Sequence, residues 1–124
     1  MKVLTGRVVQ GRKLGRTIGF PTANLDIPPR SAPPRGVYRV LIDGTQFERR
    51  LGVCNVGFRP TVGGKALVVE VHIPGFAGNL YRRRLTVTFV EKLRAEKRFK
   101  SVGALRAQIA RDVKRALASD KKKS

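Results

Sequence analysis

Residues 11–24, GRKLGRTIGFPTAN, combine three glycines with cations and neutral side-chain oxygens. The glycines allow a ligand to approach the backbone closely, and Lys13 and Arg16 can neutralise phosphate. Thr22 and Asn24 are two residues apart, so their oxygens project the same way from an extended backbone. Such a pair can hold a hard cation such as Mg²⁺, whose remaining ligands are water and nucleotide phosphates. An ordinary structured loop has a similar composition and the Walker pattern is absent, so both interpretations stay open here.

A carboxylate, Glu70, interrupts the otherwise apolar run LVVEVHI at residues 67–73. Strand alternation places Leu67, Val69, Val71 and Ile73 on one face, and Val68, Glu70 and His72 on the other. A carboxylate in such a setting costs free energy unless it is paired or used in chemistry. Glu70 is therefore either an outward residue paired with an arginine or a general base. His72 is either its neighbour in a site or a polar surface group.

The composition limits the class of protein. With 124 residues, 41% of them hydrophobic, the chain can form one domain with a single core. It has neither a run of about 18 apolar residues nor a signal-peptide pattern, so we expect a cytoplasmic protein without a membrane span. One cysteine and one histidine exclude an internal disulfide and a four-ligand zinc site. The cysteine, Cys54, is interpreted as a small core residue.

The charge is strongly positive: 27 Lys and Arg against 8 Asp and Glu give a formal net charge of +19. The excess is spread over the chain, with clusters at residues 82–84 (RRR) and 121–123 (KKK). Such clusters are either a solvated surface or an attraction for polyanions, nucleotides or nucleic acid, and charge alone does not decide between them.

Short β-type runs must position these side chains. Turn signals separate runs at 3–9, 37–42, 47–56, 67–73 and 85–90, and five or six such strands without intervening helices indicate a small antiparallel barrel. A Gly/Pro-rich stretch, 11–36, holds five of the seven prolines and is long enough to be a functional loop.

The period changes after Ser101, a plausible N-cap. Apolar residues then recur at helical spacing and predict one helix whose apolar stripe packs on the barrel and whose cations Arg111, Lys114 and Arg115 face outward. The stripe comprises Val102, Leu105, Ile109, Val113, Ala116 and Leu117. We expect a folded unit at 1–118 and a disordered basic tail at 119–124.

Several motifs together resemble one family. Residues 15–24 resemble the signature G-R-x-[LI]-G-[FY]-P-T-A-N of riboflavin kinases. Further similar motifs follow in the family's order: GVY at 36–38, NVGFRPT at 55–61, VEVHI at 69–73, LY at 80–81 and LRAEKRFKS at 93–101. The resemblance covers roughly residues 5–117.

The resemblance implies a mainly β fold, a six-stranded antiparallel Greek-key barrel with a C-terminal helix. It implies transfer of the ATP γ-phosphate to the ribityl 5′-hydroxyl of riboflavin, giving FMN, with Mg²⁺ as cofactor. The partners would then be the small molecules riboflavin and ATP, and the protein would be a monomer. The basic surface, independently of the resemblance, leaves a nonspecific polyanion contact open. Many members of the family carry a fused adenylyltransferase whose motif requires two histidines. This chain has one histidine, so the expected product is FMN and not FAD.

The resemblance also implies roles for single residues. Glu70 would be the base, and Thr22 and Asn24 would hold Mg²⁺ and the nucleotide. The nucleotide side would comprise Gly15, Arg16, Gly19, Pro21, Thr22, Asn24, His72 and Tyr81. The flavin side would comprise Arg94, Phe99, Ser101 and Leu105.

One loop departs from the family pattern. Where the family commonly has D-F-x-x-D-L-Y-G, residues 74–82 read PGFAGNLYR: both carboxylates and the glycine after Tyr81 are absent, and three arginines follow. Two alternatives to a kinase therefore stay open: a basic barrel that binds nucleic acid, and a catalytically weakened flavin- or nucleotide-binding module. The presence of Glu70 argues against the weakened module.

Overall fold

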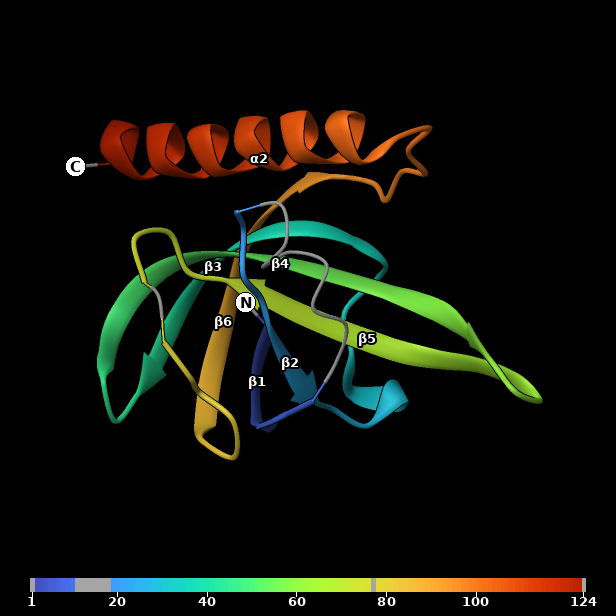
Figure 1. Ribbon diagram of the computed structural model, residues 1–124. Helices are drawn as coiled ribbons and strands as arrows, with labels where there is room; N and C mark the ends of the chain where they lie inside the picture. Colours follow the sequence, from blue (N-terminus) through green and yellow to red (C-terminus); the bar gives the residue numbers. More distant parts are fainter. Residues whose placement is uncertain (1, 11–18, 77, 124) are drawn as a thin grey trace.

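The computed structural model describes residues 2–10, 19–76 and 78–123, and within them six strands form one closed antiparallel barrel (Figure 1). The order around the barrel is β1-β2-β5-β4-β3-β6. The bounds are β1 (Lys2–Val9), β2 (Ala23–Asp26), β3 (Gly36–Gly44), β4 (Phe47–Thr61), β5 (Gly64–His72) and β6 (Arg84–Arg94). A short 3₁₀ helix, η1 (Pro29–Ser31), precedes β3, and α2 (Val102–Lys123) follows β6. The predicted six-stranded barrel with a C-terminal helix is confirmed.

The strand that sequence patterns did not identify is β2. It is four residues long and lies inside the Gly/Pro-rich stretch that we expected to be a loop. It pairs with β1 on one side, at Val8↔Leu25, and with β5 on the other, at Asn24↔Glu70. Because β2 closes the barrel between two existing strands, its conformation depends on tertiary pairing more than on its own sequence.

The alternation of β5 is confirmed. Val69 and Val71 are almost fully buried in the barrel interior, where Leu67 and Ile73 also pack, while Glu70 lies on the other face. The prediction for Cys54 also holds, since its side chain is fully buried in the same core. Burial raises the pKa of the Cys54 thiol, and the nearby negative charge of Glu70 raises it further, so Cys54 stays protonated and inert.

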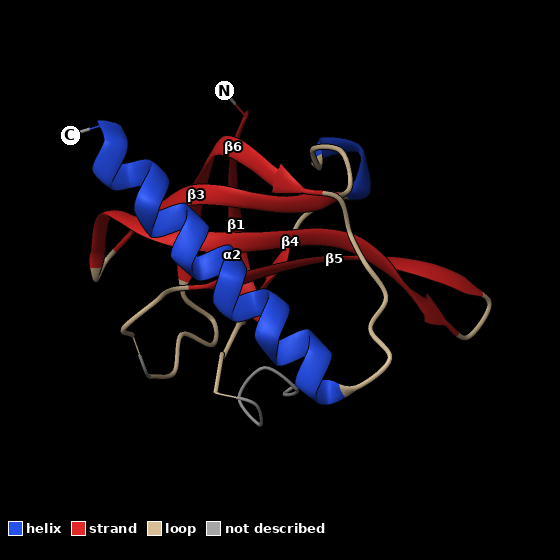
Figure 2. Ribbon diagram, turned by 90° about the horizontal axis from the view of Figure 1, so that it is seen from above, coloured by secondary structure: helices blue, strands red, loops and turns tan. Residues whose placement is uncertain are grey.

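The predicted cap of α2 is confirmed, because the backbone N–H of Ala104 donates to Ser101 Oγ at 3.1 Å. Helix α2 lies across the outside of the barrel (Figure 2). The centre of the predicted stripe packs there, where Val113 and Ala116 lie against Val37, Val53 and Leu93. At its two ends the stripe prediction was wrong, as Val102 and Leu117 are exposed. Arg111, Lys114 and Arg115 are exposed, as predicted, but Arg115 Nη1 donates to the carbonyl oxygen of Leu93 on β6 and so turns back toward the barrel.

The backbone of α2 continues to Lys123, and the division into a folded unit at 1–118 and a disordered tail at 119–124 stays a prediction. Within the described residues, no helix combines the length and apolar character that crossing a membrane requires.

A bidentate ion pair attaches α2 to the barrel. Arg94, the last residue of β6, donates through Nε to Asp112 Oδ1 at 2.9 Å and through Nη2 to Asp112 Oδ2 at 2.8 Å. The Asp112 side chain is only 5% exposed, and it also accepts a hydrogen bond from Gln108. A buried carboxylate needs such partners, so this ion pair fixes the side of α2 that faces the barrel.

Glu96 fastens the connection between β6 and α2. Its carboxylate accepts hydrogen bonds from Arg35 and from Arg59, each at 3.2 Å to the nearest nitrogen. The carboxylate lies directly on the Cα of Gly57, where a Cβ would overlap it. Gly57 therefore leaves room for this carboxylate, and the ion pair of Glu96 with Arg59 holds the segment that follows β6 against β4.

Replacing Asp112 with Ala should lower the free energy of unfolding by about 3 kcal/mol, because a poorly exposed Arg94 guanidinium is left without its partner. Urea unfolding would measure the change. The exposed Lys114 on the same helix is the control, and Lys114→Ala should change stability by less than about 0.5 kcal/mol. Equal effects of the two variants would contradict a docking role for the ion pair.

Replacing Gly57 with Ala should lower the free energy of unfolding by about 1–3 kcal/mol, because the added methyl group displaces Glu96 from its two arginines. Gly64→Ala is the matched control, since a Cβ at Gly64 meets no atom within 4 Å. Thermal and urea unfolding of both variants would test the contrast. Similar stability of the two would mean that Glu96 relocates without loss.

Candidate functional site

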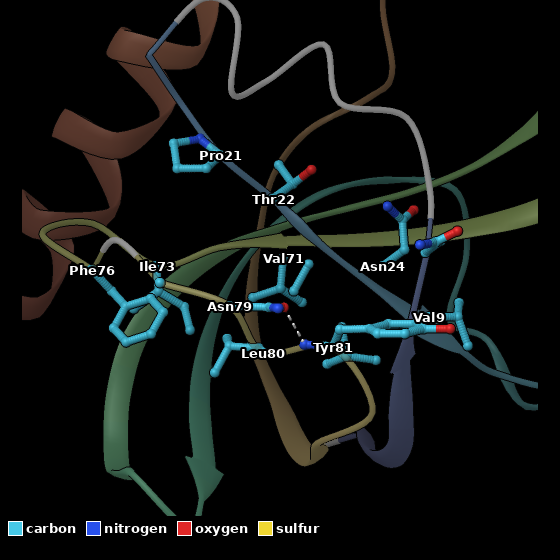
Figure 3. A pocket seen from close by; sticks show the side chains of 14 residues that line it. Val9, Pro21, Thr22, Asn24, Val71, Ile73, Phe76, Asn79, Leu80 and Tyr81 are labelled. Carbon is cyan, nitrogen blue, oxygen red and sulfur yellow. Dashed lines mark hydrogen bonds between the residues drawn. The ribbon is translucent and has the colours of Figure 1, made fainter.

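Two cavities adjoin each other at the barrel and share one lining residue, Thr22. The smaller cavity, about 420 Å³, lies between the start of β2 and the loop residues 73–76 and 78–81 (Figure 3). The larger cavity, about 700 Å³, lies between β4, β5, the segment after β6 and α2. Thr22 therefore forms the wall shared by the two cavities, and a group bound in either cavity can reach it.

Glu70 is at this shared wall. Thr22 Oγ1 donates to Glu70 Oε2 at 3.3 Å, although the two residues are 48 positions apart in the chain. Asn24 is directly opposite Glu70 in the antiparallel register of β2 and β5, so the two side chains project from the same face. The pairing of these strands thus brings together the three residues for which we predicted chemistry.

His72 contacts the segment that leads into β2. Its Nδ1 is 2.8 Å from the carbonyl oxygen of Pro21, and its ring contacts that of Phe20 edge-on at 5.4 Å between centroids. The histidine is 8% exposed and lines the larger cavity, not the smaller one. Its contacts in this structure keep Phe20 and Pro21 against β5 and so position Thr22.

Apolar and polar residues both line the smaller cavity. Among the predicted nucleotide-side residues, Pro21, Thr22, Asn24 and Tyr81 line it. Gly19 is not among the lining residues; it has φ of 89°, a left-handed conformation that glycine adopts without strain just before this segment. Gly15, Arg16 and Lys13 lie outside the described residues.

The larger cavity is lined by three of the four predicted flavin-side residues, Arg94, Phe99 and Leu105. The guanidinium of Arg94 lies 6.0 Å from the ring centroid of Phe99 while it is bound to Asp112. The fourth, Ser101, is not among the lining residues and caps α2 instead. Ser101 therefore supports the cavity indirectly, by fixing where the helix begins.

Several lining residues of the larger cavity had no predicted role: Arg35, Asn55, Phe58, Arg59, Glu96 and Asp112. Most lie within the motifs at 55–61 and 93–101, which could have marked them. Arg35 and Asp112 lie outside these motifs. They reach the cavity only because β3 and α2 pack beside it.

The donor groups on the two sides of Thr22 are oxygens: Thr22 itself has a hydroxyl, Asn24 in the smaller cavity has an amide, and Glu70 in the larger cavity has a carboxylate. Hard divalent cations prefer oxygen ligands, and Mg²⁺ in particular keeps several waters and needs few protein groups. Within the described part of the chain there is no cluster of three or more His, Cys, Asp and Glu side chains suited to a metal. The residues present thus fit a cation that is bound together with a phosphate-bearing ligand, and not a cation held by protein alone.

Comparison with known proteins identifies the family. The family described as "Flavokinase: Riboflavin kinase" matches residues 2–119. The bifunctional riboflavin kinase/FMN adenylyltransferase of Escherichia coli K12 is 48% identical over 109 residues, which cover 88% of this chain and 35% of that protein. The enzyme of the same name from Pseudomonas fluorescens is 49% identical over 118 residues, covering 93% of this chain and 37% of that protein.

The crystal structure of riboflavin kinase from Trypanosoma brucei superposes with a TM-score of 0.69 and 22% identity, covering 97% of this chain and 80% of that one, and supports the fold. The chain spans little more than a third of the length of the two bifunctional relatives. A match over nearly the whole of this chain, together with the ordered motifs, shows that the chain belongs to the riboflavin kinase family.

Proposed function

We propose that this chain is an ATP:riboflavin 5′-phosphotransferase, a riboflavin kinase that makes FMN. The observation that carries the proposal is the contact between Thr22 and Glu70 at the wall shared by the two cavities. A phosphoryl donor in one cavity and an alcohol in the other would meet at this carboxylate. Transfer between two bound substrates needs mainly positioning and charge neutralisation, which such an arrangement can supply.

The nucleotide would occupy the smaller cavity. Its apolar lining residues suit a base, and Tyr81 offers an aromatic face at the rim. The phosphates would then extend toward Thr22 and Asn24, and Gly15, Gly19 and Arg16 of the preceding segment would contact them. In this proposal Pro21 shapes the wall, and His72 acts indirectly by holding the Pro21 carbonyl.

Riboflavin would occupy the larger cavity, whose volume of about 700 Å³ falls in the usual range for small-molecule sites. Phe99 and Leu105 provide apolar contacts for a flat ring system. Arg94 supports this wall while it is bound to Asp112, and Ser101 supports it through the helix cap. The ribityl chain would point toward Glu70.

Glu70 is proposed to accept the proton of the ribityl 5′-hydroxyl as that oxygen attacks the γ-phosphorus and the bond to the β-phosphate oxygen breaks. The hydrogen bond from Thr22 orients the Glu70 carboxylate. Thr22 and Asn24 would hold Mg²⁺, which when bound neutralises charge on the nucleotide phosphates.

Incubation of the chain with riboflavin, ATP and Mg²⁺ should give FMN, detected by chromatography, and removal of Mg²⁺ with a chelator should abolish its formation. Binding of riboflavin without any FMN would instead support the weakened binding module. An absence of both would reject the assignment of the two cavities.

Glu70→Gln should lower kcat for FMN formation by about 100-fold or more, because the amide keeps the size of the side chain but cannot accept the proton. The KM for ATP should change by less than about twofold, since the base contributes to the transition state and not to ground-state binding. Glu48→Gln, at an exposed position of β4, is the control and should leave both constants unchanged. A parallel loss of ATP binding and of stability in Glu70→Gln would mean that Glu70 is structural.

A further inference from the structure

Four exposed arginines gather beside the smaller cavity, where β6 begins next to β1. We call Arg7, Arg82, Arg83 and Arg84 the arginine patch. Arg7 and Arg84 are directly opposite each other in the β1–β6 register, and Arg7 Nη1 donates to the carbonyl oxygen of Arg82 at 3.2 Å. The carboxylate nearest by register is that of Asp26, opposite Arg7 on β2.

Two features of the patch lower the local stability of the fold. Like charges directly opposite each other on neighbouring strands are destabilising. In addition, Arg82 has φ of 71°, in the left-handed region, which is strained for any residue with a Cβ and which glycine would occupy freely. Hydrogen bonds from Arg82 N to Val8 O and from Arg83 N to Leu80 O, both at 2.9 Å, hold this conformation.

An exposed aromatic ring borders the patch. Tyr81 is 41% exposed, and the guanidinium carbon of Arg82 lies 5.3 Å from its ring centroid. The side chain of Asn79 accepts a hydrogen bond from the backbone N–H of Tyr81 at 2.9 Å, and this bond holds the turn (Figure 3). A cation and an aromatic face are thus presented together at the rim.

None of the four arginines is among the residues that line the smaller cavity, whereas Tyr81 is. A mononucleotide seated in the cavity would therefore reach the ring and leave the patch unused. A longer polyanion could use both, and the formal charge of +19 favours such a partner.

We propose that Tyr81 and the arginine patch bind single-stranded nucleic acid, with one base stacked on Tyr81 and successive phosphates on the arginines. A single strand is required because only an unpaired base offers its face to an exposed ring. This binding goes beyond the phosphotransfer proposed above and does not depend on it.

The test uses fluorescence anisotropy of a labelled RNA of about 12 nucleotides, a DNA of the same sequence and the corresponding duplex, at about 50 and about 200 mM salt. Both single strands should bind, more tightly than the duplex and with affinity that falls steeply with salt. Equal affinity for the duplex, or no binding at the lower salt, would overturn the proposal.

Arg82→Gly and Arg49→Gly form a matched pair, because Arg49 is also exposed and also has positive φ, 47°, at the β3–β4 hairpin. Each variant removes one charge and relaxes one strained residue. Arg82→Gly should weaken binding about 5- to 10-fold and reduce the salt slope by about 0.7, while Arg49→Gly should change affinity by less than about twofold. The thermal midpoint of Arg82→Gly should be no lower than that of the original chain. Equal weakening by the two variants would show that only diffuse charge acts, against the proposal.

Tyr81→Leu should weaken binding about tenfold, whereas Tyr81→Phe should retain it, because stacking needs the ring and not the hydroxyl. Equal affinity of the Leu and Phe variants would exclude stacking on Tyr81.

Anisotropy is measured without riboflavin or ATP, so a failure to form FMN leaves these results intact. Mg²⁺-ATP should displace the oligonucleotide if the nucleotide occupies the smaller cavity, and this arm alone rests on the proposed function.

Discussion

The pairing of β2 with β5 is the constraint on which the candidate site depends. Only this register sets Asn24 opposite Glu70 and brings Thr22 within hydrogen-bonding distance of the same carboxylate. A slip of one residue would turn Glu70 into the apolar interior and Val71 out of it, at a large cost in free energy. The hydrophobic core that fixes the register therefore also fixes the position of the proposed base.

Several carboxylates of this basic chain border the larger cavity. Three of its eight acidic residues, Glu70, Glu96 and Asp112, line that cavity. Glu96 and Asp112 are each held by arginine, one against β4 and the other against β6. Because charged groups with little exposure need partners, these ion pairs fix the segment after β6 and the angle of α2 together, and the cavity takes its shape from both.

The positive charge separates into parts with different surroundings. Arg35, Arg59 and Arg94 are paired with carboxylates in the wall of the larger cavity. The arginine patch lies outside both cavities, at a place where the backbone of Arg82 is strained and an aromatic ring is exposed. The proposed phosphotransfer uses the paired arginines only indirectly, as supports, and does not use the patch.

Local patterns were enough to predict the β5 alternation, the Ser101 cap, the burial of Cys54 and, through ordered motifs, the family. These features depend on residues close together in the chain, so their periodicity is visible in the sequence. The position of β2, the contact of His72 with Pro21 and the pairing of Arg94 with Asp112 were not predictable in this way. Each depends on which distant segments come together when the barrel closes and α2 docks, and such contacts leave no periodic trace in the sequence. The sequence thus determined the fold class and the residues able to do chemistry, and the tertiary structure decided which of them meet, because long-range strand pairing and buried ion pairs select the partners.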